Sequence, residues 1–181
     1  MQVIQTPLQG LLILQPQAFK DERGWFMESF NSARFEAAVG QPVHFVQDNH
    51  SFSTQGVLRG LHYQVAPQAQ AKLVRVVEGR VWDVAVDIRV NSPTRGQSFG
   101  LELSAENRKQ LWIPAGFAHG FLTLSDTSQF LYKTTHFYDP ACERSILWSD
   151  PALAISWPIE QMPLVNIKDQ QAALFSDAPP M

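Results

Sequence analysis

The order of apolar and polar positions along the chain predicts mostly short β-strands. Residues 73–77 and 81–90 are rich in β-branched side chains, and Glu78 and Gly79 between them are typical of a tight turn. By the same criteria, further strands are expected at residues 57–64, 98–103, 110–113, 120–123 and 129–135. Many short strands with turn residues between them favour an all-β sandwich or a closed barrel.

Only one segment has a clear helical pattern. Asn31 is a suitable N-cap, an apolar stripe follows it, and Gly40 is placed to end the helix. A further single turn of helix is expected at residues 169–174. The chain contains no internal repeat, linker or low-complexity stretch, so residues 1–181 are predicted to form one domain.

The composition limits the kinds of molecule that the protein is expected to bind and the compartment in which it is expected to work. A net charge of −3 gives no reason to expect binding to nucleic acid or to an anionic membrane surface. Cys142 is the only cysteine, which excludes an intrachain disulfide and a metal site built from cysteines. The longest apolar run near the start, residues 11–14, is too short to cross a bilayer and follows no basic leader. A cytoplasmic protein is therefore expected.

A histidine motif raises the question of a metal site. Pro114, Gly116 and His119 form a Pro-x-Gly-x-x-His pattern that resembles the second conserved motif of the cupin barrels, whose histidine usually binds a metal. The first cupin motif requires His-x-His and a later Glu, but the best match here begins at His62 and has Gln64 in place of the second histidine. A metal needs three or four converging ligands, so a site without metal is predicted. His119 then either contacts a substrate or forms a local hydrogen bond.

Several other polar residues are ambiguous when each is taken alone. His62 could be a structural histidine, Lys72 a solvated lysine at a strand start, Tyr132 a core tyrosine and Asp169 a helix N-cap. Strict alternation along the strand at residues 57–64 would also place Arg59 and His62 on opposite faces. These residues indicate a functional site only if the fold brings them close together in space.

Six blocks of the sequence, taken together, resemble the dTDP-4-dehydrorhamnose 3,5-epimerases of L-rhamnose biosynthesis. The blocks are Phe-x-Asp-x-Arg-Gly-x-Phe-x-Glu-x-Phe from Phe19, then Gln47 to Ser51, Gly56 to Gln64, Gln70 to Arg75, Trp112 to Phe121, and Tyr138 to Pro140. They follow the family's order and cover nearly the whole chain. The resemblance implies a cupin-like antiparallel β-barrel, or jelly roll, with a few short helices. It also implies a homodimer that binds a dTDP-sugar and uses no cofactor.

The resemblance also implies catalytic roles for four residues. His62 matches the general base and is paired with Asp169. Tyr132 matches the acid that returns a proton from the opposite face of the sugar, and Lys72 matches the cation beside the C4 oxygen. The implied reaction inverts C3 and C5 of dTDP-4-dehydro-6-deoxy-D-glucose and gives dTDP-4-dehydro-L-rhamnose.

Further residues match the family's contacts with its substrate, some of which the dimer partner would supply. They are Arg23, Arg59 and Lys168 mainly at the diphosphate, Glu28, Gln47, Asp48 and Asn49 around the nucleotide, Tyr138 against the thymine, and His119 and Glu143. One departure lies next to this set, because the approach Val165-Asn166-Ile167 to Lys168 and Asp169 is unusual for the family.

The chemistry of this reaction agrees with these residue types. The protons at C3 and C5 flank a C4 ketone, so removal of either gives an enolate. A histidine has a suitable pKa to act as the base, and a lysine can stabilise the enolate oxygen. Three alternatives within the barrel class remain: an epimerase of C3 or C5 alone, a 3,4-ketoisomerase lacking the Tyr132 match, and a barrel that binds sugar nucleotides without catalysis. A metal-dependent dioxygenase would need the missing first-motif ligands.

Overall fold

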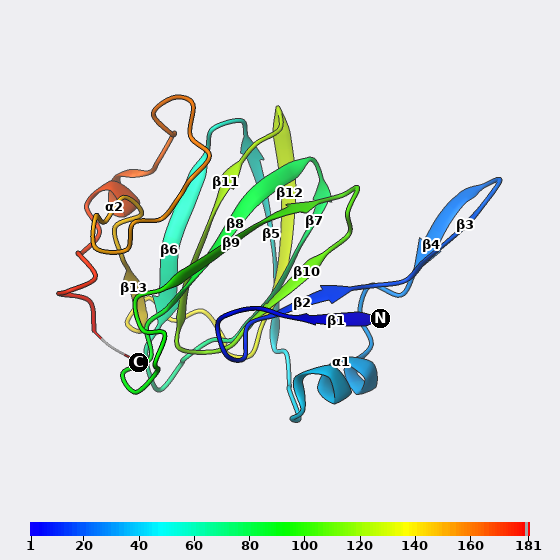
Figure 1. Cartoon of the computed structure of the whole chain (residues 1–181), viewed down its shortest axis with the longest axis horizontal. Helices are drawn as coiled ribbons and strands as arrows, with labels where there is room; N and C mark the ends of the chain where they lie inside the picture. Colours follow the sequence, from blue (N-terminus) through cyan, green and yellow to red (C-terminus); the bar gives the residue numbers. More distant parts are fainter. Residues whose placement is uncertain (180) are drawn as a thin grey trace.

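The structure, a computed structural model, describes residues 1–179 and 181 and is built around two antiparallel β-sheets that face each other (Figure 1). The six-stranded sheet has the order β1 (Gln2–Gln5), β2 (Leu12–Gln15), β10 (Gln110–Ile113), β7 (Lys72–Glu78), β12 (Thr127–Thr134) and β5 (Gln47–Thr54). The five-stranded sheet has the order β13 (Glu143–Ser145), β6 (Leu58–Gln64), β11 (Phe117–Thr123), β8 (Arg80–Asp87) and β9 (Ser98–Ser104). The remaining elements are the hairpin β3 (Ala18–Asp21) and β4 (Gly24–Met27), and the helices α1 (Ser32–Val39) and α2 (Ile167–Gln170).

The apolar core lies between the two sheets. Phe121 from the five-stranded sheet stacks on Phe130 from the six-stranded sheet, with ring centroids 4.3 Å apart and an interplanar angle of 11°. Phe130 also lies against His119 and Tyr132, with centroid distances of 6.0 and 6.2 Å. Burial of large aromatic and aliphatic side chains here supplies the main stabilisation of the barrel. The same aromatic layer packs against His119 and Tyr132, which are two of the candidate site residues.

The predicted all-β architecture is confirmed, with differences at the ends of the chain. All the predicted strands are present, although β11 begins at Phe117 rather than at residue 120. The strands β1 to β5 and β13 were not among the predicted strands, and the block from Phe19 forms the hairpin β3–β4. These strands carry few of the alternating apolar positions that reveal a strand in sequence.

The predicted helix is confirmed at both ends. The side chain of Asn31 accepts a hydrogen bond from the backbone N–H of Arg34, and Gly40 ends α1 in the left-handed region with φ 76°. The second helix covers Ile167–Gln170, so the prediction of residues 169–174 was wrong. Asn166 starts this helix by accepting a hydrogen bond from the N–H of Asp169, which places Asp169 inside the helix and excludes Asp169 as its N-cap.

A register shift in the pairing of β6 with β11 changes the predicted side-chain faces. His62 pairs with His119 and Arg59 with Phe121, so three residue steps on β6 match two on β11. Arg59 and His62 therefore share the inner face, and the prediction of opposite faces was wrong. The strands touch closely there, because a Cβ on Gly60 would lie 2.6 Å from the Cα of Gly120. Gly60 is thus needed for the close contact between β6 and β11.

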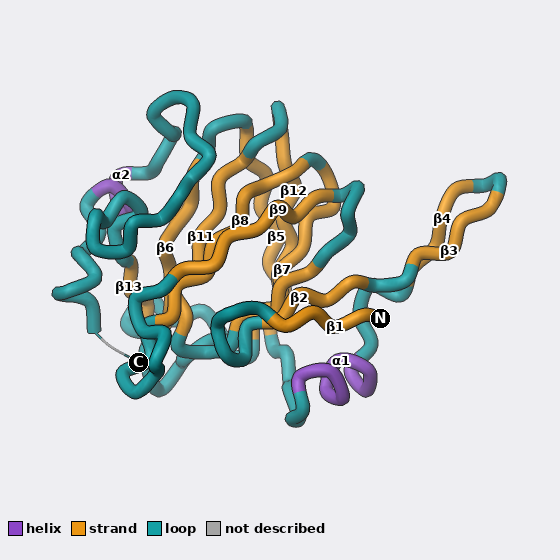
Figure 2. Tube along the Cα trace, in the orientation of Figure 1, coloured by secondary structure: helices purple, strands orange, loops and turns teal. Residues whose placement is uncertain are grey.

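Two parts of the chain lie outside the barrel. The β3–β4 hairpin projects away from both sheets (Figure 1). The side chains of Phe19, Trp25 and Phe26 on this hairpin are exposed. The segment after β13 runs mostly as loops and turns over the side of β6 and carries α2 (Figure 2). Over residues 1–179 and 181, no helix is long and apolar enough to cross a membrane.

Candidate active site

His62 and Asp169 form a close pair at the edge of the five-stranded sheet. His62 Nε2 lies 2.6 Å from Asp169 Oδ1, although 107 residues separate the two in sequence. Asp169 is fully buried, whereas the side chain of His62 is 29% exposed. Burial alone would raise the pKa of Asp169, but the hydrogen bonds from His62 and from the backbone of Gly60 outweigh it and leave the pKa below its usual value. The pair is therefore a buried carboxylate that orients an accessible imidazole.

Lys72 is buried where β7 begins, so the reading of Lys72 as a solvated lysine was wrong. Its Nζ lies 3.4 Å from the main-chain oxygen of His62, which links the two sheets at this point. Burial lowers the pKa of Lys72 to about 8, although the negative charges of Glu143 and Asp83 oppose that shift. The ammonium group is therefore present at neutral pH but poorly solvated, which suits the stabilisation of a developing negative charge.

Tyr132 faces this group from the opposite sheet. It lies on β12 in the six-stranded sheet, whereas His62 lies on β6 in the five-stranded sheet. Burial raises the pKa of the Tyr132 phenol, and the charge of Glu143 adds to that shift while Arg59 opposes it. The phenol therefore stays protonated at neutral pH and is able to donate a proton.

His119 is held by Asp83, a carboxylate that belongs to none of the sequence motifs. His119 Nε2 lies 2.9 Å from Asp83 Oδ2, and both side chains are buried. Oδ1 of Asp83 has no hydrogen-bond partner in the part of the chain that the structure describes. A sequence signal existed, because Asp83 shares a face with Asp87 in a strand of β-branched residues, where an acidic side chain is out of place.

Glu143 connects three neighbouring segments at the mouth of the site. It accepts a hydrogen bond from the Tyr138 hydroxyl at 2.9 Å and forms a close ion pair with Lys168 on α2. Burial would raise the pKa of Glu143, but the hydrogen bonds from Lys168 and Tyr138 outweigh it and lower the pKa. Gln47 extends this group, since its Oε1 accepts from the backbone N–H of Tyr138 and its Nε2 donates to Asn49.

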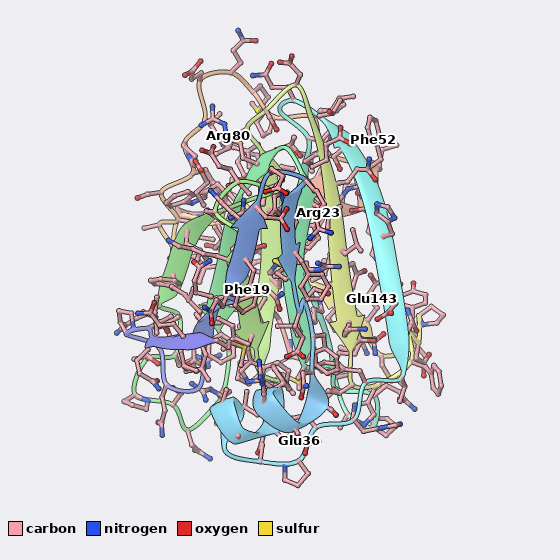
Figure 3. The ribbon with its side chains drawn as sticks, turned by 90° about the vertical axis from the view of Figure 1, so that its right-hand side faces the viewer. Phe19, Arg23, Glu36, Phe52, Arg80 and Glu143 are labelled. Atoms are coloured by element: carbon pink, nitrogen blue, oxygen red, sulfur yellow. The ribbon has the colours of Figure 1, made fainter. Side chains whose placement is uncertain are left out.

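Three of the predicted binding residues do not reach this group within one chain. Arg23, labelled in Figure 3, lies on the projecting hairpin with its side chain 84% exposed. Figure 1 shows this hairpin on the opposite side of the molecule from β13, the strand that carries Glu143. Glu28 pairs with Arg34 of α1 at 3.2 Å. Asp48 pairs with Lys133 on the outer face of the six-stranded sheet, because alternation along β5 turns it away from its neighbours in sequence.

Arg59 does lie on the inner face. It donates to the Ser53 hydroxyl at 3.0 Å and to the main-chain oxygen of Phe52 at 3.1 Å, which fixes the guanidinium beside β5. Gln64, the residue in the place of the second cupin histidine, is engaged with the loop around Phe137 and with the backbone of Asp139. Within residues 1–179 and 181, no three His, Cys, Asp or Glu side chains lie close enough together to hold a metal ion.

The fold and site define a cupin-like barrel in which a histidine of β6 is paired with a buried carboxylate of α2. The family model described as dTDP-4-dehydrorhamnose 3,5-epimerase matches residues 5–177 of this chain. The chain therefore belongs to the dTDP-4-dehydrorhamnose 3,5-epimerase family, as the sequence blocks predicted.

Relatives of known activity and structure support this membership. The chain is 60% identical to the dTDP-4-dehydrorhamnose 3,5-epimerase of Shigella flexneri over 178 residues, which is 98% of each protein. It is also similar to the crystal structure of the dTDP-6-deoxy-D-glucose-3,5-epimerase of Legionella pneumophila in complex with dTDP-4-keto-L-rhamnose. That similarity has a TM-score of 0.94 and 51% identity, covering 97% of this chain and 93% of the other. A 3-epimerase of Streptomyces niveus is more distant, at 39% identity over 94% of this chain and 82% of that protein.

Proposed function

We propose that this protein inverts C3 and C5 of dTDP-4-dehydro-6-deoxy-D-glucose and forms dTDP-4-dehydro-L-rhamnose for dTDP-L-rhamnose biosynthesis. The observation that carries the proposal is the 2.6 Å contact of His62 with the buried Asp169, on the sheet opposite Tyr132. The activity named for the Shigella relative and the sugar nucleotide bound in the Legionella structure support the same substrate.

In this proposal His62 is the base. Its Nε2 carries the proton that is donated to Asp169, so Nδ1 is the free nitrogen that takes a proton from C3 or C5. The electron pair of the broken C–H bond moves onto the C4 oxygen and gives an enolate, which the Lys72 ammonium stabilises. Tyr132 then donates its phenolic proton to the same carbon from the other side. Proton exchange with solvent restores His62 and Tyr132 before the second inversion.

The placement of these groups on two sheets supports inversion rather than simple exchange. A sugar ring lying between β6 and β12 would have His62 on one side and Tyr132 on the other. Arg59, Lys168 and Glu143 lie beside this space and are suited to hold the nucleotide end, with guanidinium and ammonium groups on the diphosphate.

Solvent deuterium incorporation tests this function. Purified protein is mixed with dTDP-4-dehydro-6-deoxy-D-glucose in heavy water, and the label at C3 and C5 is followed by NMR. We expect label and inversion at both carbons. Label at one carbon only would assign the chain to the mono-epimerases. In Tyr132→Phe, exchange by His62 should persist while inversion falls, and undiminished inversion would exclude Tyr132 as the acid.

We propose that the protein acts as a homodimer in which the β3–β4 hairpin reaches the site of the partner. The exposed Phe19, Trp25 and Phe26 on this projecting hairpin support an apolar contact with another surface. Arg23 on the same hairpin has no role within its own chain beyond its pairing with Asp21, over the residues that the structure describes. In this arrangement Arg23 would bind the diphosphate of the substrate that lies in the partner's site.

Mixing two inactive variants tests this arrangement. If Arg23 serves the partner's site, a dimer of one Arg23→Ala subunit and one His62→Ala subunit contains one intact site. Random exchange should then restore about a quarter of the wild-type rate at substrate concentrations below KM. An affinity tag on one of the two variants allows the mixed dimers to be separated and counted. No gain in a mixture shown to contain mixed dimers would place Arg23 in the site of its own chain.

We further propose that residues 1–181 act as one domain and that the enzyme works in the cytoplasm. The free and buried Cys142 is compatible with a reducing compartment. Neither the dTDP-sugar site nor the chemistry above calls for a cofactor, a nucleic acid or a membrane.

A further inference from the structure

The carboxylate of Asp169 has a third hydrogen-bond partner besides His62 and Gly60, which is Asn166. Its Oδ1 faces His62 Nε2 at 2.6 Å, and its Oδ2 accepts from the backbone N–H of Gly60 at 3.0 Å. Oδ2 also accepts from the side-chain amide of Asn166 at 3.3 Å. The oxygen of that amide in turn accepts from the backbone N–H of Asp169 at 2.7 Å. Asn166 therefore holds both the main chain and the side chain of Asp169.

We infer that Asn166 is a positioning residue for the His62–Asp169 pair and not only the N-cap of α2. The inference rests on the proposed role of that pair. An amide carries both an acceptor and donors, so one side chain can cap the helix and bind the carboxylate. Aspartate has only acceptors when ionised, and the single hydroxyl of serine cannot reproduce the two-point contact.

The setting of Asp169 explains why it needs such support. α2 has only four residues, Ile167–Gln170, and lies at the end of a long segment of loops and turns. A short helix of this kind does not fix the direction of a side chain by itself. The contacts to Gly60 and Asn166 hold Oδ2 from two directions, which leaves Oδ1 directed at His62. The segment Val165-Asn166-Ile167, unusual for the family, thus has a defined role in this chain.

Two substitutions separate capping from positioning. Asn and Ser are about equally good N-caps, so Asn166→Ser should keep the melting temperature close to that of the wild type. Asn166→Asp also keeps a good N-cap but brings a second carboxylate up to the buried Asp169, so its melting temperature should fall. If Asn166 also positions Asp169, kcat/KM at pH 7 should fall about 5-fold in Asn166→Ser, which lacks the second contact. The fall should be larger in Asn166→Asp, about 20-fold, because two carboxylates then face each other.

The pH profile gives a second readout that capping alone would not move. A new carboxylate beside Asp169 adds negative charge next to the proposed base, and added negative charge favours the protonated form of a base. The acidic limb of kcat/KM should therefore move to higher pH in Asn166→Asp and stay near its wild-type position in Asn166→Ser. The affinity for dTDP should not change in either variant.

A matched control comes from the same helix. Gln170→Ser removes a 2.7 Å hydrogen bond to the main-chain oxygen of Val165 but touches neither His62 nor Asp169, so kcat/KM should be unchanged. Full activity and an unshifted profile in both Asn166 variants would overturn the inference and leave Asn166 as a cap. Full activity in Asp169→Asn would instead show that the proposed pair is wrong, which keeps the two failures distinct.

Discussion

Replacing His62 by alanine should lower kcat by about 10³-fold or more while dTDP binds with unchanged affinity. The imidazole is the accessible member of the pair, and its Nδ1 is the atom proposed to remove the sugar protons. In the part of the chain that the structure describes, no hydrogen bond joins His62 to the Lys168–Glu143 ion pair, so the nucleotide end keeps its hydrogen bonds. Initial rates at saturating substrate give kcat, and calorimetric titration with dTDP gives the affinity for dTDP.

The exposed His44 offers a matched control, since it lies in the loop before β5 and away from the barrel interior. His44→Ala should retain the wild-type rate. Loss of dTDP binding in His62→Ala would assign this histidine to substrate binding, and a rate within tenfold of wild type would remove it from the chemistry.

Replacing Lys72 by methionine should lower kcat/KM by about 10²- to 10³-fold, because the enolate oxygen loses its cation. The same change should make the folded protein more stable. The pKa of Lys72 falls from 10.5 to about 8 on burial, so at pH 7 the buried charge costs about 3 kcal/mol of stability. Methionine has a similar length and no charge to bury. Activity assays and thermal unfolding at pH 7 measure both effects.

The pH dependence of that stability difference follows from the sign of the shift. Between about pH 8 and 10.5 the unfolded chain binds more protons at Lys72 than the folded chain does. The free energy of unfolding of the wild type therefore rises with pH in this range and approaches that of the variant. The advantage of Lys72→Met should therefore shrink towards pH 10. A variant that is less stable than the wild type at pH 7 would mean that the Lys72 ammonium is held favourably in the fold.

The barrel could be predicted from sequence because its central strands carry β-branched runs bounded by turns, as β7 and β8 do. The N-terminal strands β3 and β4 could not, since they are mostly exposed and their apolar residues do not alternate with polar ones. The sequence also could not predict that Arg59 and His62 lie on the same face of β6. That shared face depends on a register shift between β6 and β11, and strand pairing is not encoded in the alternation of one strand.

The candidate site was predictable mainly through the family resemblance. Residue by residue, the sequence favoured ordinary structural roles for His62 and Asp169, whose contact spans 107 positions. Asp83 and Asn166 were missed as partners because neither belongs to a motif, and only the fold brings them beside His119 and Asp169. Arg23 and Glu28 remain predictions that depend on a second subunit.

The late position of α2 in the chain has a consequence for biosynthesis. A ribosome makes β6 to β12 before it makes Asp169, so the strands that carry His62, Lys72 and Tyr132 can pair while the chain is still growing. His62 receives its carboxylate only after Asp169, 107 positions further along, has been made. A nascent barrel can therefore close around its core without yet being an acid–base catalyst, and activity begins only once α2 has been made and has packed against β6.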